Sequence, residues 1–522
     1  MTRAIVGAAL GLCVVALVPD ALRWVRVAQR EHYLPGSASR FAWRWWTSRP
    51  VSAASALAAG AAAVASAFVA AAALVTAAAG ALGPPGLGVR GRTARLRWTR
   101  RCTTLGAGVA VGSGALVGTG AMLGGARGAL VASAAVVVAM PVVVDGVLTV
   151  LRPVEDRLAR HFVEEAAERV ARVRPTIVGV TGSYGKTSTK VYIAHLLAGR
   201  LSVVASPRSF NNRAGLARTV NELLVPGTDV LVAEMGAYGP GEIAGLCAWL
   251  PPKVAVLTAI GPVHLERFRT LERTVAAKSE ITVGAEVVVV NGDDPLLAAL
   301  ADRLVQSGRR VVRCSALDRE SDIAVLEHEG GLALYVSGRH AGTAAIEGGD
   351  VASARSNVAC AAAVALELGC TPDEVIGRLG SLPPVANRLA PVRSPSGALV
   401  LDDTFNSNPA GAALALGELR SRSRPGGRRY LVTPGMVELG SVQRSENAAL
   451  ARAAAEVATD VIVVGRTNRR ALVAGLAEAR ASGHDVAEHH VVTRDDAVAL
   501  LRGVLQPEDV VLYENDLPDH FP

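Results

Sequence analysis

The sequence predicts an α/β protein in which N-terminal transmembrane helices precede a P-loop domain with a parallel sheet and a Rossmann-like α/β domain. Long uncharged stretches are concentrated in the first 150 of the 522 residues. From Thr176 onward, short β-branched runs alternate with alanine-rich helical segments, which is typical of a parallel sheet covered by helices. The same alternation resumes after Gly397. We expect a transmembrane region over residues 1–150, a helical stalk over 151–174, a central domain over 175–383 and a C-terminal domain over 384–522.

Four uncharged stretches make up most of the first 150 residues. They are Ala4–Pro19, Val51–Gly88, Thr103–Ala126 and Gly128–Val144. A membrane-spanning helix needs about 20 apolar residues, and arginine-rich loops prefer the cytoplasm. If the second stretch crosses twice, five crossings place the C-terminal domains in the cytoplasm, whereas a break at Gly83–Gly86 favours one long helix. We expect a multi-pass protein of the cell membrane with a cytoplasmic catalytic body, rather than the buried core helices of a large soluble protein.

Charge is distributed unevenly along the chain. The formal net charge is +8, but residues 1–174 contain 20 arginines, no lysine and eight acidic residues. The basic residues therefore lie beside the apolar stretches, which fits membrane topology better than nucleic-acid binding, and no nucleic-acid partner is expected. The six cysteines are scattered without a Cys-x-x-Cys pair, which argues against a zinc ribbon and against a thioredoxin-like redox site.

The element boundaries after residue 150 follow from local patterns. Leu151–Val173 is charged and helical in pattern, and it closes before Pro175. Four β-branched runs predict strands of the central domain: Thr176–Val180, Val230–Ala233, Val254–Leu257 and Val287–Val290. Four further runs predict strands of the C-terminal domain: Ala398–Leu401, Arg429–Val432, Val461–Val464 and Val510–Tyr513. Gly380–Arg388, which contains two adjacent prolines, is the predicted hinge.

The first predicted strand leads into a phosphate-binding loop, and a helix follows. The loop residues are Gly182, Ser183, Tyr184, Gly185, Lys186, Thr187 and Ser188. Backbone N–H groups of such a loop surround phosphate oxygens. Lys186 would then neutralise the β- and γ-phosphates of ATP, and the Thr187 hydroxyl would ligate Mg²⁺. The strict P-loop pattern places Gly or Ala five residues before Gly185, where this chain has Val180.

Further blocks follow this loop in a fixed order. They are Ser209-Phe-Asn-Asn212, Glu234-Met-Gly-Ala237, Gly241-Glu-Ile243, Gly261-Pro-Val-His264, Ala277-Lys278-Ser-Glu280, Asp402–Pro409 and Gly435–Gly440. Through these blocks and the loop, residues 175–522 resemble the Mur ligase family. The resemblance implies an ATP-binding central domain, a mobile C-terminal domain and an ATP-dependent ligase that uses Mg²⁺.

The resemblance also implies roles for individual side chains at the phosphates. Glu234 follows an apolar strand and would supply a hard oxygen ligand for Mg²⁺ beside Thr187. His264 would hold a second metal ion, together with Lys278 if that lysine is carbamylated. Lys186, His264 and Lys278 are the expected catalytic residues.

The remaining expected contacts lie farther along the chain. Asn211 and Asn212 would orient the γ-phosphate and the acyl group, although a turn or cap role is an equal alternative. The expected ATP contacts outside the loop are Asn357, Arg388, Asp403, Asn406 and Asn408. For Asp403, Asn406 and Asn408, the alternative is an ordinary Asx-rich loop after a strand.

The implied reaction joins a carboxylate to an amine in cell-envelope synthesis. The carboxylate attacks the γ-phosphate of ATP, and the amine then displaces phosphate from the acyl phosphate. We expect a carboxylate acyl donor and an amino acid or dipeptide acceptor. Because apolar segments replace the nucleotide-sugar-binding domain of the family, the donor is expected to be lipid-linked or otherwise different from the soluble precursor. Tyr513–Pro518 stands where the family has a Lys-Gly-Ser-Arg stretch, so the acceptor is expected to differ from the usual dipeptide.

Two other classes of function remain open at this point. One is a P-loop ATPase subunit that powers membrane transport or assembly, and the other is a membrane scaffold with a degenerate ligase body. The Asp402–Pro409 block has no evident use in a transport ATPase, and Lys186, Thr187, Glu234, His264 and Lys278 are all intact. ATP turnover that depends on an added amine separates the ligase from both alternatives.

Overall fold

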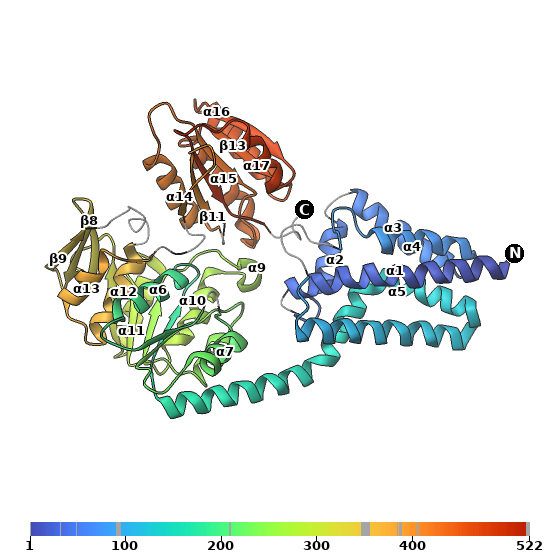
Figure 1. Cartoon of the computed structure of the whole chain (residues 1–522), viewed down its shortest axis with the longest axis horizontal. Helices are drawn as coiled ribbons and strands as arrows, with labels where there is room; N and C mark the ends of the chain where they lie inside the picture. The colour runs from blue at the N-terminus through green and yellow to red at the C-terminus, as the bar shows by residue number, and fades with distance from the viewer. Residues whose placement is uncertain are drawn as a thin grey trace. The chain divides into compact units, whose positions relative to one another are not determined.

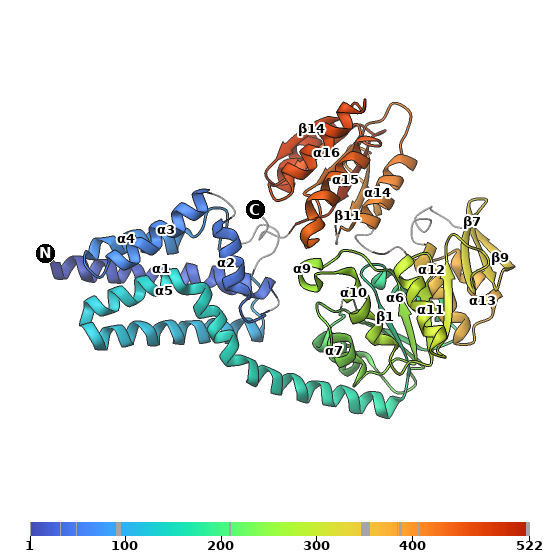
Figure 2. The same cartoon turned by 180° about the vertical axis from the view of Figure 1, so that it is seen from behind.

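The structure is a computed structural model of the chain (Figures 1 and 2). It describes residues 2–31, 33–47, 50–89, 96–207, 210–345, 355–383, 385, 389–404 and 407–517. Contacts divide the chain into two compact units, Met1–Leu158 with Leu517–Pro522, and Ala159–Asp516. Each unit has its own buried apolar clusters and is described by itself.

The described residues of the first unit form helices only. The helices are α1 (Thr2–Arg30), α2 (Ser37–Thr47), α3 (Pro50–Ala65), the 3₁₀ turn η1 (Ala70–Ala72), α4 (Ala73–Leu82) and the first part of α5 (Arg100–Val173). Non-helical backbone at Gly124 and Gly125 interrupts α5. On either side of this break, Gly120 and Gly128 approach so closely that a Cβ on either one would overlap the carbonyl oxygen of the other. Only glycine permits this contact, which folds the helix back on itself.

A buried arginine joins α1 to the end of α4. The Arg23 guanidinium is almost completely buried and pairs with Asp20 at 2.9 Å. It also donates to the carbonyl oxygens of Gly80, Ala81 and Leu87, at 3.0, 3.2 and 2.9 Å. The last carbonyls of a helix lack intrahelical partners, so a cation at this end satisfies them and favours the helix dipole.

A carboxylate from α5 caps the start of α2. Asp145 accepts hydrogen bonds from the backbone N–H groups of Ala38 and Ser39 at 3.2 and 2.8 Å, and from the Ser39 hydroxyl at 2.5 Å. The first N–H groups of a helix have no intrahelical acceptor. Asp145 supplies that acceptor from more than a hundred residues along the chain, and thereby fixes α2 against α5.

The predicted multi-pass membrane localisation is wrong. Five crossings need five helices of about 20 apolar residues. In the part of the chain that the structure describes, only Arg3–Arg30 and Arg100–Val173 are long and apolar enough to cross a membrane. Residues 51–88 form α3 and α4, which are both too short. One or two apolar helices do not establish a membrane protein, because buried core helices and signal sequences have the same composition.

The second unit begins with a nine-stranded sheet. Its strands are β1 (Thr176–Thr181), β2 (Val203–Ala205), β3 (Val230–Glu234), β4 (Val254–Leu257), β5 (Val287–Asn291), β6 (Arg310–Ser315), β7 (Ile323–His328), β8 (Gly331–Val336) and β9 (Arg339–Ala345). The strand order is β2-β3-β1-β4-β5-β6-β7-β8-β9. Strands β1 to β7 pair in parallel, and β8 and β9 extend the sheet as antiparallel hairpins.

Helices cover both faces of this sheet, as parallel sheets require. Val178 and Val180 of β1 pack into a cluster with α6 (Lys186–Leu197), α12 (Arg355–Glu367) and α13 (Pro372–Leu379). Ile177 points to the opposite face, because side chains alternate along a strand. That face is covered by α7 (Arg213–Leu223), α8 (Glu242–Cys247), α10 (Leu271–Ser279) and α11 (Pro295–Gln306). Val163 and Ala166 at the end of α5 belong to the same cluster.

A second sheet forms the C-terminal domain. Its strands are β10 (Ala390–Arg393), β11 (Leu399–Asp403), β12 (Arg429–Thr433), β13 (Asp460–Val464), β14 (Ala487–Val491) and β15 (Val510–Glu514), in the order β10-β11-β15-β12-β13-β14. Only β10, an edge strand, is antiparallel to its neighbour. Helices α14 (Pro409–Ser421), α15 (Gln443–Ala455) and α16 (Arg469–Ala481) cover one face, and α17 (Arg494–Arg502) covers the other.

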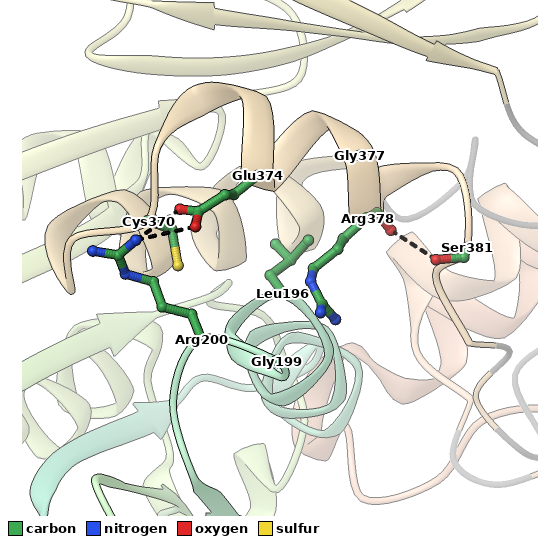
Figure 3. A pocket seen from close by; sticks show the side chains of 8 residues that line it. All are labelled: Leu196, Gly199, Arg200, Cys370, Glu374, Gly377, Arg378 and Ser381. Atoms are coloured by element: carbon green, nitrogen blue, oxygen red, sulfur yellow. Dashed lines mark hydrogen bonds and ion pairs between the residues drawn. The ribbon is translucent and has the colours of Figure 1, made fainter.

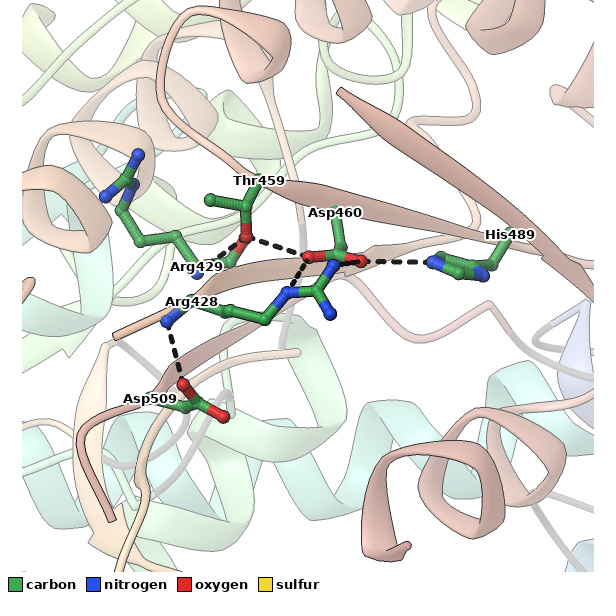
Figure 4. A network of polar contacts seen from close by, with 6 residues as sticks. All are labelled: Arg428, Arg429, Thr459, Asp460, His489 and Asp509. Atoms are coloured by element: carbon green, nitrogen blue, oxygen red, sulfur yellow. Dashed lines mark hydrogen bonds and ion pairs between the residues drawn. The ribbon is translucent and has the colours of Figure 1, made fainter. Parts of the chain in front are cut away.

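A buried carboxylate joins three neighbouring strands of this sheet (Figure 4). Asp460, the first residue of β13, accepts two hydrogen bonds from the Arg428 guanidinium at 2.6 and 3.0 Å, and one from the Thr459 hydroxyl at 2.8 Å. The His489 ring of β14 lies 3.1 Å from the same carboxylate. Arg428 and Asp460 lie at the amino ends of β12 and β13, opposite the edge where parallel sheets bind ligands.

The predicted α/β fold with parallel sheets is confirmed. All eight predicted strands are present, and each boundary differs by two residues or fewer from the prediction. The sequence pattern did not identify β2, the extension β6–β9, β10 or β14. The predicted hinge lies partly outside the described residues, which omit 384 and 386–388.

Candidate active site

The P-loop lies where the order of the central sheet changes direction. Strand β1 pairs with β3 on one side and β4 on the other, so the loops after β1 and β4 leave the sheet side by side. Crevices of this kind are the usual ligand sites of open α/β sheets. Gly182 and Gly185 both have positive φ, and a Cβ on them would overlap the Thr258 hydroxyl and the Asn357 carboxamide. Both positions therefore require glycine.

Side chains fasten the P-loop to the segment that follows β4. The Ser183 backbone N–H donates to Ala259 O at 2.6 Å, and its hydroxyl donates to Gly261 O at 3.2 Å. The Tyr184 hydroxyl donates to Ile260 O at 3.1 Å, and burial raises the pKa of Tyr184 to about 12. These two predicted ATP-binding side chains thus hold the loop in shape, and the phosphate contacts of such a loop come from its backbone.

Lys186 and Thr187 begin helix α6. The Lys186 ammonium donates back to Gly182 O at 2.8 Å and Ser183 O at 3.1 Å. It therefore lies across the loop, near the oxygens that a phosphate would present. The Thr187 hydroxyl donates to Glu234 Oε2 at 2.9 Å, and Ser188 is buried behind it. The P-loop thus brings a cation and a hydroxyl to the carboxyl edge of the sheet.

Glu234, the last residue of β3, accepts hydrogen bonds from three side chains. Its Oε2 receives the Thr187 hydroxyl and, at 3.0 Å, the Lys190 ammonium. Its Oε1 receives the Asn211 carboxamide at 3.2 Å. A hydroxyl and a carboxylate in contact are the hard oxygen donors that Mg²⁺ takes from proteins, with phosphates and water completing its shell. The residues present therefore fit a Mg²⁺ ion bound together with a nucleotide.

Lys278 is buried on α10 and close to the P-loop. The pKa of Lys278 is lowered to about 7, mainly by burial and then by the nearby Lys186, while Glu242 opposes both effects. The ammonium lies 5.8 Å from the centre of the Phe268 ring. Glu280, two residues on, accepts from the backbone N–H groups of Gly241 and Ala244 at 2.7 and 2.9 Å. Two of the blocks that the sequence singled out are therefore joined in space.

His264 precedes the short helix α9 (Leu265–Phe268), and its φ of 57° is unusual for a residue other than glycine. Its ring lies edge-on to Tyr238, with 4.7 Å between the ring centres. Its Nδ1 is hydrogen-bonded to the carboxylate of Glu438. No group of three or more His, Cys, Asp or Glu side chains in the described residues is arranged to hold a metal by itself.

Several side chains predicted to bind ATP or substrate form hydrogen bonds within the chain or are buried. The Asn212 carboxamide caps α7 by accepting from Gly215 N, and Asn408 caps α14 by accepting from Gly411 N, both at 2.9 Å. Asn357 on α12 lies against Gly185 and accepts from the Thr189 hydroxyl at 3.3 Å. Asp403 is buried at the end of β11. The predicted ATP contacts of these residues remain predictions, and Arg388 and Asn406 lie outside the described residues.

Sequence reasoning overlooked Lys190 and Glu438. Lys190 follows Lys186 by one helical turn, so the spacing places both on the same face of α6. Its partner Glu234 lies 44 residues away, and only the fold shows that contact. Glu438 was part of a noted block, but its contact with His264 spans 174 residues. Local sequence patterns could have suggested Lys190. They could not have suggested its contact with Glu234 or the contact of Glu438 with His264.

A separate pocket lies at the other end of α6 (Figure 3). It has a volume of about 500 Å³ and is lined by Leu196, Gly199, Arg200, Cys370, Glu374, Gly377, Arg378 and Ser381. Arg200 and Glu374 form an exposed ion pair at 3.0 Å across it. α6 has 12 residues and is therefore about 18 Å long, so this pocket is remote from the P-loop at its start.

Both α/β domains match models of known protein families. The family model of the Mur ligase middle domain matches residues 180–365, and that of the Mur ligase glutamate ligase domain matches residues 387–513. The UDP-N-acetylmuramoyl-tripeptide–D-alanyl-D-alanine ligase of Mycobacterium tuberculosis is 35% identical over 359 residues, which are 65% of this chain and 69% of the relative. The Mycobacterium leprae enzyme of that name is 35% identical over 68% of this chain and 73% of its own length.

Solved structures agree with this assignment. MurF from Acinetobacter baumannii aligns with a TM-score of 0.60 at 22% identity, and covers 69% of this chain and 77% of that one. MurF from Thermotoga maritima in complex with ADP aligns with a TM-score of 0.56 at 28% identity, and covers 69% and 80%. With the two domain matches and the intact P-loop, these similarities lead to one conclusion: the chain belongs to the Mur ligase family and is an ATP-dependent ligase of peptidoglycan synthesis.

Proposed function

We propose that this site activates a peptide carboxylate with ATP and couples it to the amine of an amino acid or dipeptide. The observation that carries the proposal is the convergence of Lys186, Thr187 and Glu234 at the carboxyl edge of the central sheet. The carboxylate oxygen attacks the γ-phosphorus and ADP leaves. The amine nitrogen then attacks the acyl carbon, phosphate leaves, and the amine loses a proton. Lys186 lies where the charge of the transferring phosphoryl group develops, and charge stabilisation is the main contribution a protein makes to this chemistry.

We also propose that Thr187 and Glu234 hold a Mg²⁺ ion with the nucleotide, and that His264 and Lys278 hold a second one. The ions would neutralise the phosphate oxygens when bound. His264 could serve through Nε2, because its Nδ1 is hydrogen-bonded to Glu438, and a carboxylate on the other ring nitrogen orients a metal-ligating histidine. Lys278 can serve only if carbamylation converts its ammonium into a carboxylate-like ligand. The lowered pKa of Lys278 supports this step, because only the neutral amine attacks carbon dioxide.

The relatives suggest the class of substrate. They are named for a UDP-linked tripeptide and for D-alanyl-D-alanine. A lipid-linked donor, which the apolar N-terminus suggested, has no support among them. We propose a peptidoglycan precursor peptide as the donor. The stretch Tyr513–Pro518 has Glu514 and Asp516 and no cation, where the family has a Lys-Gly-Ser-Arg stretch. Glu514 accepts from the Ser407 hydroxyl at 2.5 Å, and Asp516 pairs with Arg494 at 3.0 Å. We therefore propose an acceptor other than the unmodified dipeptide.

The decisive experiment measures phosphate release from ATP by the purified chain. UDP-linked muramoyl peptides serve as donors, and a panel of amino acids and dipeptides serves as acceptors. The ligase predicts release that requires both substrates, with one amide product formed for each phosphate. Release at the same rate without any acceptor would instead favour the alternative of a P-loop ATPase.

A second experiment addresses the metal proposal. Glu234→Ala and His264→Ala are each expected to raise the Mg²⁺ concentration needed for half-maximal turnover, because each loses a proposed ligand. Glu286→Ala is a matched control, since Glu286 is an exposed carboxylate paired only loosely with Lys253 at 3.4 Å. An unchanged Mg²⁺ requirement in both test variants would contradict the assignment of these ligands.

A further inference from the structure

Lysine is rare in this protein, and its few occurrences are clustered. Only four of the 54 lysine and arginine residues are lysines: Lys186, Lys190, Lys253 and Lys278. Lys186 lies on the P-loop, and Lys190 and Lys278 are buried nearby. Only Lys253 is well exposed, with 53% of its side chain accessible. A lysine ammonium is a compact point charge, unlike the planar guanidinium that supplies nearly every other cation of this chain.

Lys190 has no role in the mechanism above, although it contacts the proposed metal ligand. Its ammonium lies 3.0 Å from Glu234 Oε2, and the side chains of Lys190 and Glu234 are only 3% and 2% exposed. Thr187, one turn earlier on α6, donates to the same oxygen at 2.9 Å. Asn211 donates to the other oxygen at 3.2 Å. The carboxylate proposed to bind Mg²⁺ is therefore paired with a cation and hydrogen-bonded on both oxygens by side chains of the protein itself.

This arrangement has an electrostatic consequence for metal binding. A carboxylate removed from water needs a partner charge, and Lys190 provides one. A divalent cation that approaches Glu234 Oε2 then meets an ammonium already in contact with that oxygen. Lys186, one helical turn before Lys190 on α6, adds positive charge to the same region. The phosphates of a nucleotide bring several negative charges. When they bind, the net charge around Glu234 changes from one that repels a divalent cation to one that attracts it.

We propose that Lys190 is a resident counter-ion that makes divalent-cation binding at Glu234 depend on the nucleotide. Without nucleotide, Lys190 occupies the carboxylate and excludes the ion. With nucleotide, the phosphates offset the charge of Lys190 and the ion binds between them and Glu234. The proposal rests on the assignment of Glu234 as a metal ligand. Lys190 would act through Glu234 and would not touch the reacting atoms, so it is a positioning residue.

The test measures binding of Mn²⁺ by electron paramagnetic resonance, with and without ADP. The wild-type chain should bind Mn²⁺ at least tenfold more tightly with ADP than without it. Lys190→Met should bind Mn²⁺ without ADP about tenfold or more tightly than the wild type, since a unit charge at contact distance has been removed. With ADP present, the affinities of variant and wild type should differ by less than about threefold, because the phosphates then dominate the local charge. Lys253→Met, which removes the exposed lysine, should match the wild type in both conditions.

Thermal unfolding gives a second readout that does not need turnover. Without metal, Lys190→Met should melt at a lower temperature than the wild type, because Glu234 loses its buried partner. Added Mn²⁺ should raise the melting temperature of the variant and leave that of the nucleotide-free wild type unchanged. If the methionine variant does not fold, Lys190→Gln keeps a hydrogen-bond donor without the charge and carries the same expectations.

Two results would overturn the proposal. One is a wild-type chain that binds Mn²⁺ equally well with and without ADP. The other is a folded Lys190 variant whose nucleotide-free affinity for Mn²⁺ is no higher than that of the wild type. Glu234→Gln distinguishes this failure from failure of the metal assignment. If Glu234→Gln leaves ADP-dependent Mn²⁺ binding intact, then Glu234 is not the ligand and the proposed metal site itself is wrong.

Discussion

The Lys186 ammonium lies over the P-loop, where a phosphate would bind. Hydrogen bonds to the carbonyl oxygens of Gly182 and Ser183 hold it in this position. Lys186→Ala is expected to lower the rate of ATP turnover by about a thousandfold, because several kcal/mol of charge stabilisation are lost. Steady-state phosphate release measures the effect, and the exposed Lys253→Ala serves as the control. Turnover like that of the wild type in a folded Lys186→Ala chain would remove the P-loop assignment.

The pKa of Lys278 leads to a prediction about stability. The pKa of this lysine is about 7 in the folded chain and near its ordinary value of 10.5 when unfolded. Between these values the unfolded chain binds one more proton, so the free energy of unfolding rises with pH, by up to about 1.4 kcal/mol per unit. Lys278→Met lacks this dependence. In carbonate-free buffer, the variant should exceed the wild type in stability near pH 7, and the difference should shrink toward pH 10. Urea unfolding at several pH values measures it, and a constant difference would contradict the burial argument.

At the same scale, the candidate site was only partly predictable. The context of the P-loop could be predicted because its glycines and the strand and helix around it are local features, and the structure has that strand, loop and helix. Asn212 and Asn408 show the limit of that approach, since a carboxamide before a helix suits a ligand contact and a helix cap equally, and both are found as caps. Lys190 escaped attention because a helical lysine is usually solvated. Its burial depends on β3, which the sequence separates from it by a whole helix and strand.

At the scale of elements, Asp460 joins three strands of the C-terminal sheet (Figure 4). Asp460→Asn removes the charge that holds Arg428 and leaves a poorer acceptor for His489. We expect a loss of about 1–3 kcal/mol in the free energy of unfolding, a range typical for a buried hydrogen-bonded group whose partner is partly exposed. Chemical denaturation of the chain measures it. Asp485→Asn, an exposed position in the same domain, should change stability by less than about 0.5 kcal/mol.

Elements with strong local patterns were predictable, and the others were not. Central strands such as β1 and β5 are buried on both faces, so their β-branched runs stand out. Strand β14 reads Ala-Glu-His-His-Val and lies at a sheet edge, where polar side chains are tolerated and no apolar run is needed. Residues 51–88 show a different limit. Their helix breaks at Ser66–Val69, without glycine or proline, and an alanine-rich run gives no local sign of such a break.

At the scale of the whole molecule, the division at Leu158 predicts that the ligase body folds independently. A chain that starts at Ala159 keeps Val163 and Ala166, which pack into the core beneath the central sheet. We expect it to unfold cooperatively and to bind ADP with an affinity within about twofold of the full chain, since domains with complete cores fold alone. Differential scanning calorimetry and isothermal titration measure the two properties.

A shorter chain that starts at Thr176 is the matched control. It loses both of these core side chains, exposes their contacts and should melt at a clearly lower temperature. Equal melting temperatures for the two truncations would show that the end of α5 contributes nothing to the ligase body. Failure of the longer truncation to fold would show that the two units depend on each other for stability.

Because lysine is scarce, amine-reactive chemicals find few side chains to modify in this protein. Acylating reagents modify neutral, accessible amines and do not modify guanidinium groups at ordinary pH. Of the four lysine side chains, only that of Lys253 combines exposure with a position away from the P-loop. A fluorophore ester would therefore attach mainly there among the side chains and leave the ligase chemistry untouched. Slower acylation at Lys186, Lys190 and Lys278, followed by mass spectrometry, would report how often the nucleotide site opens to solvent.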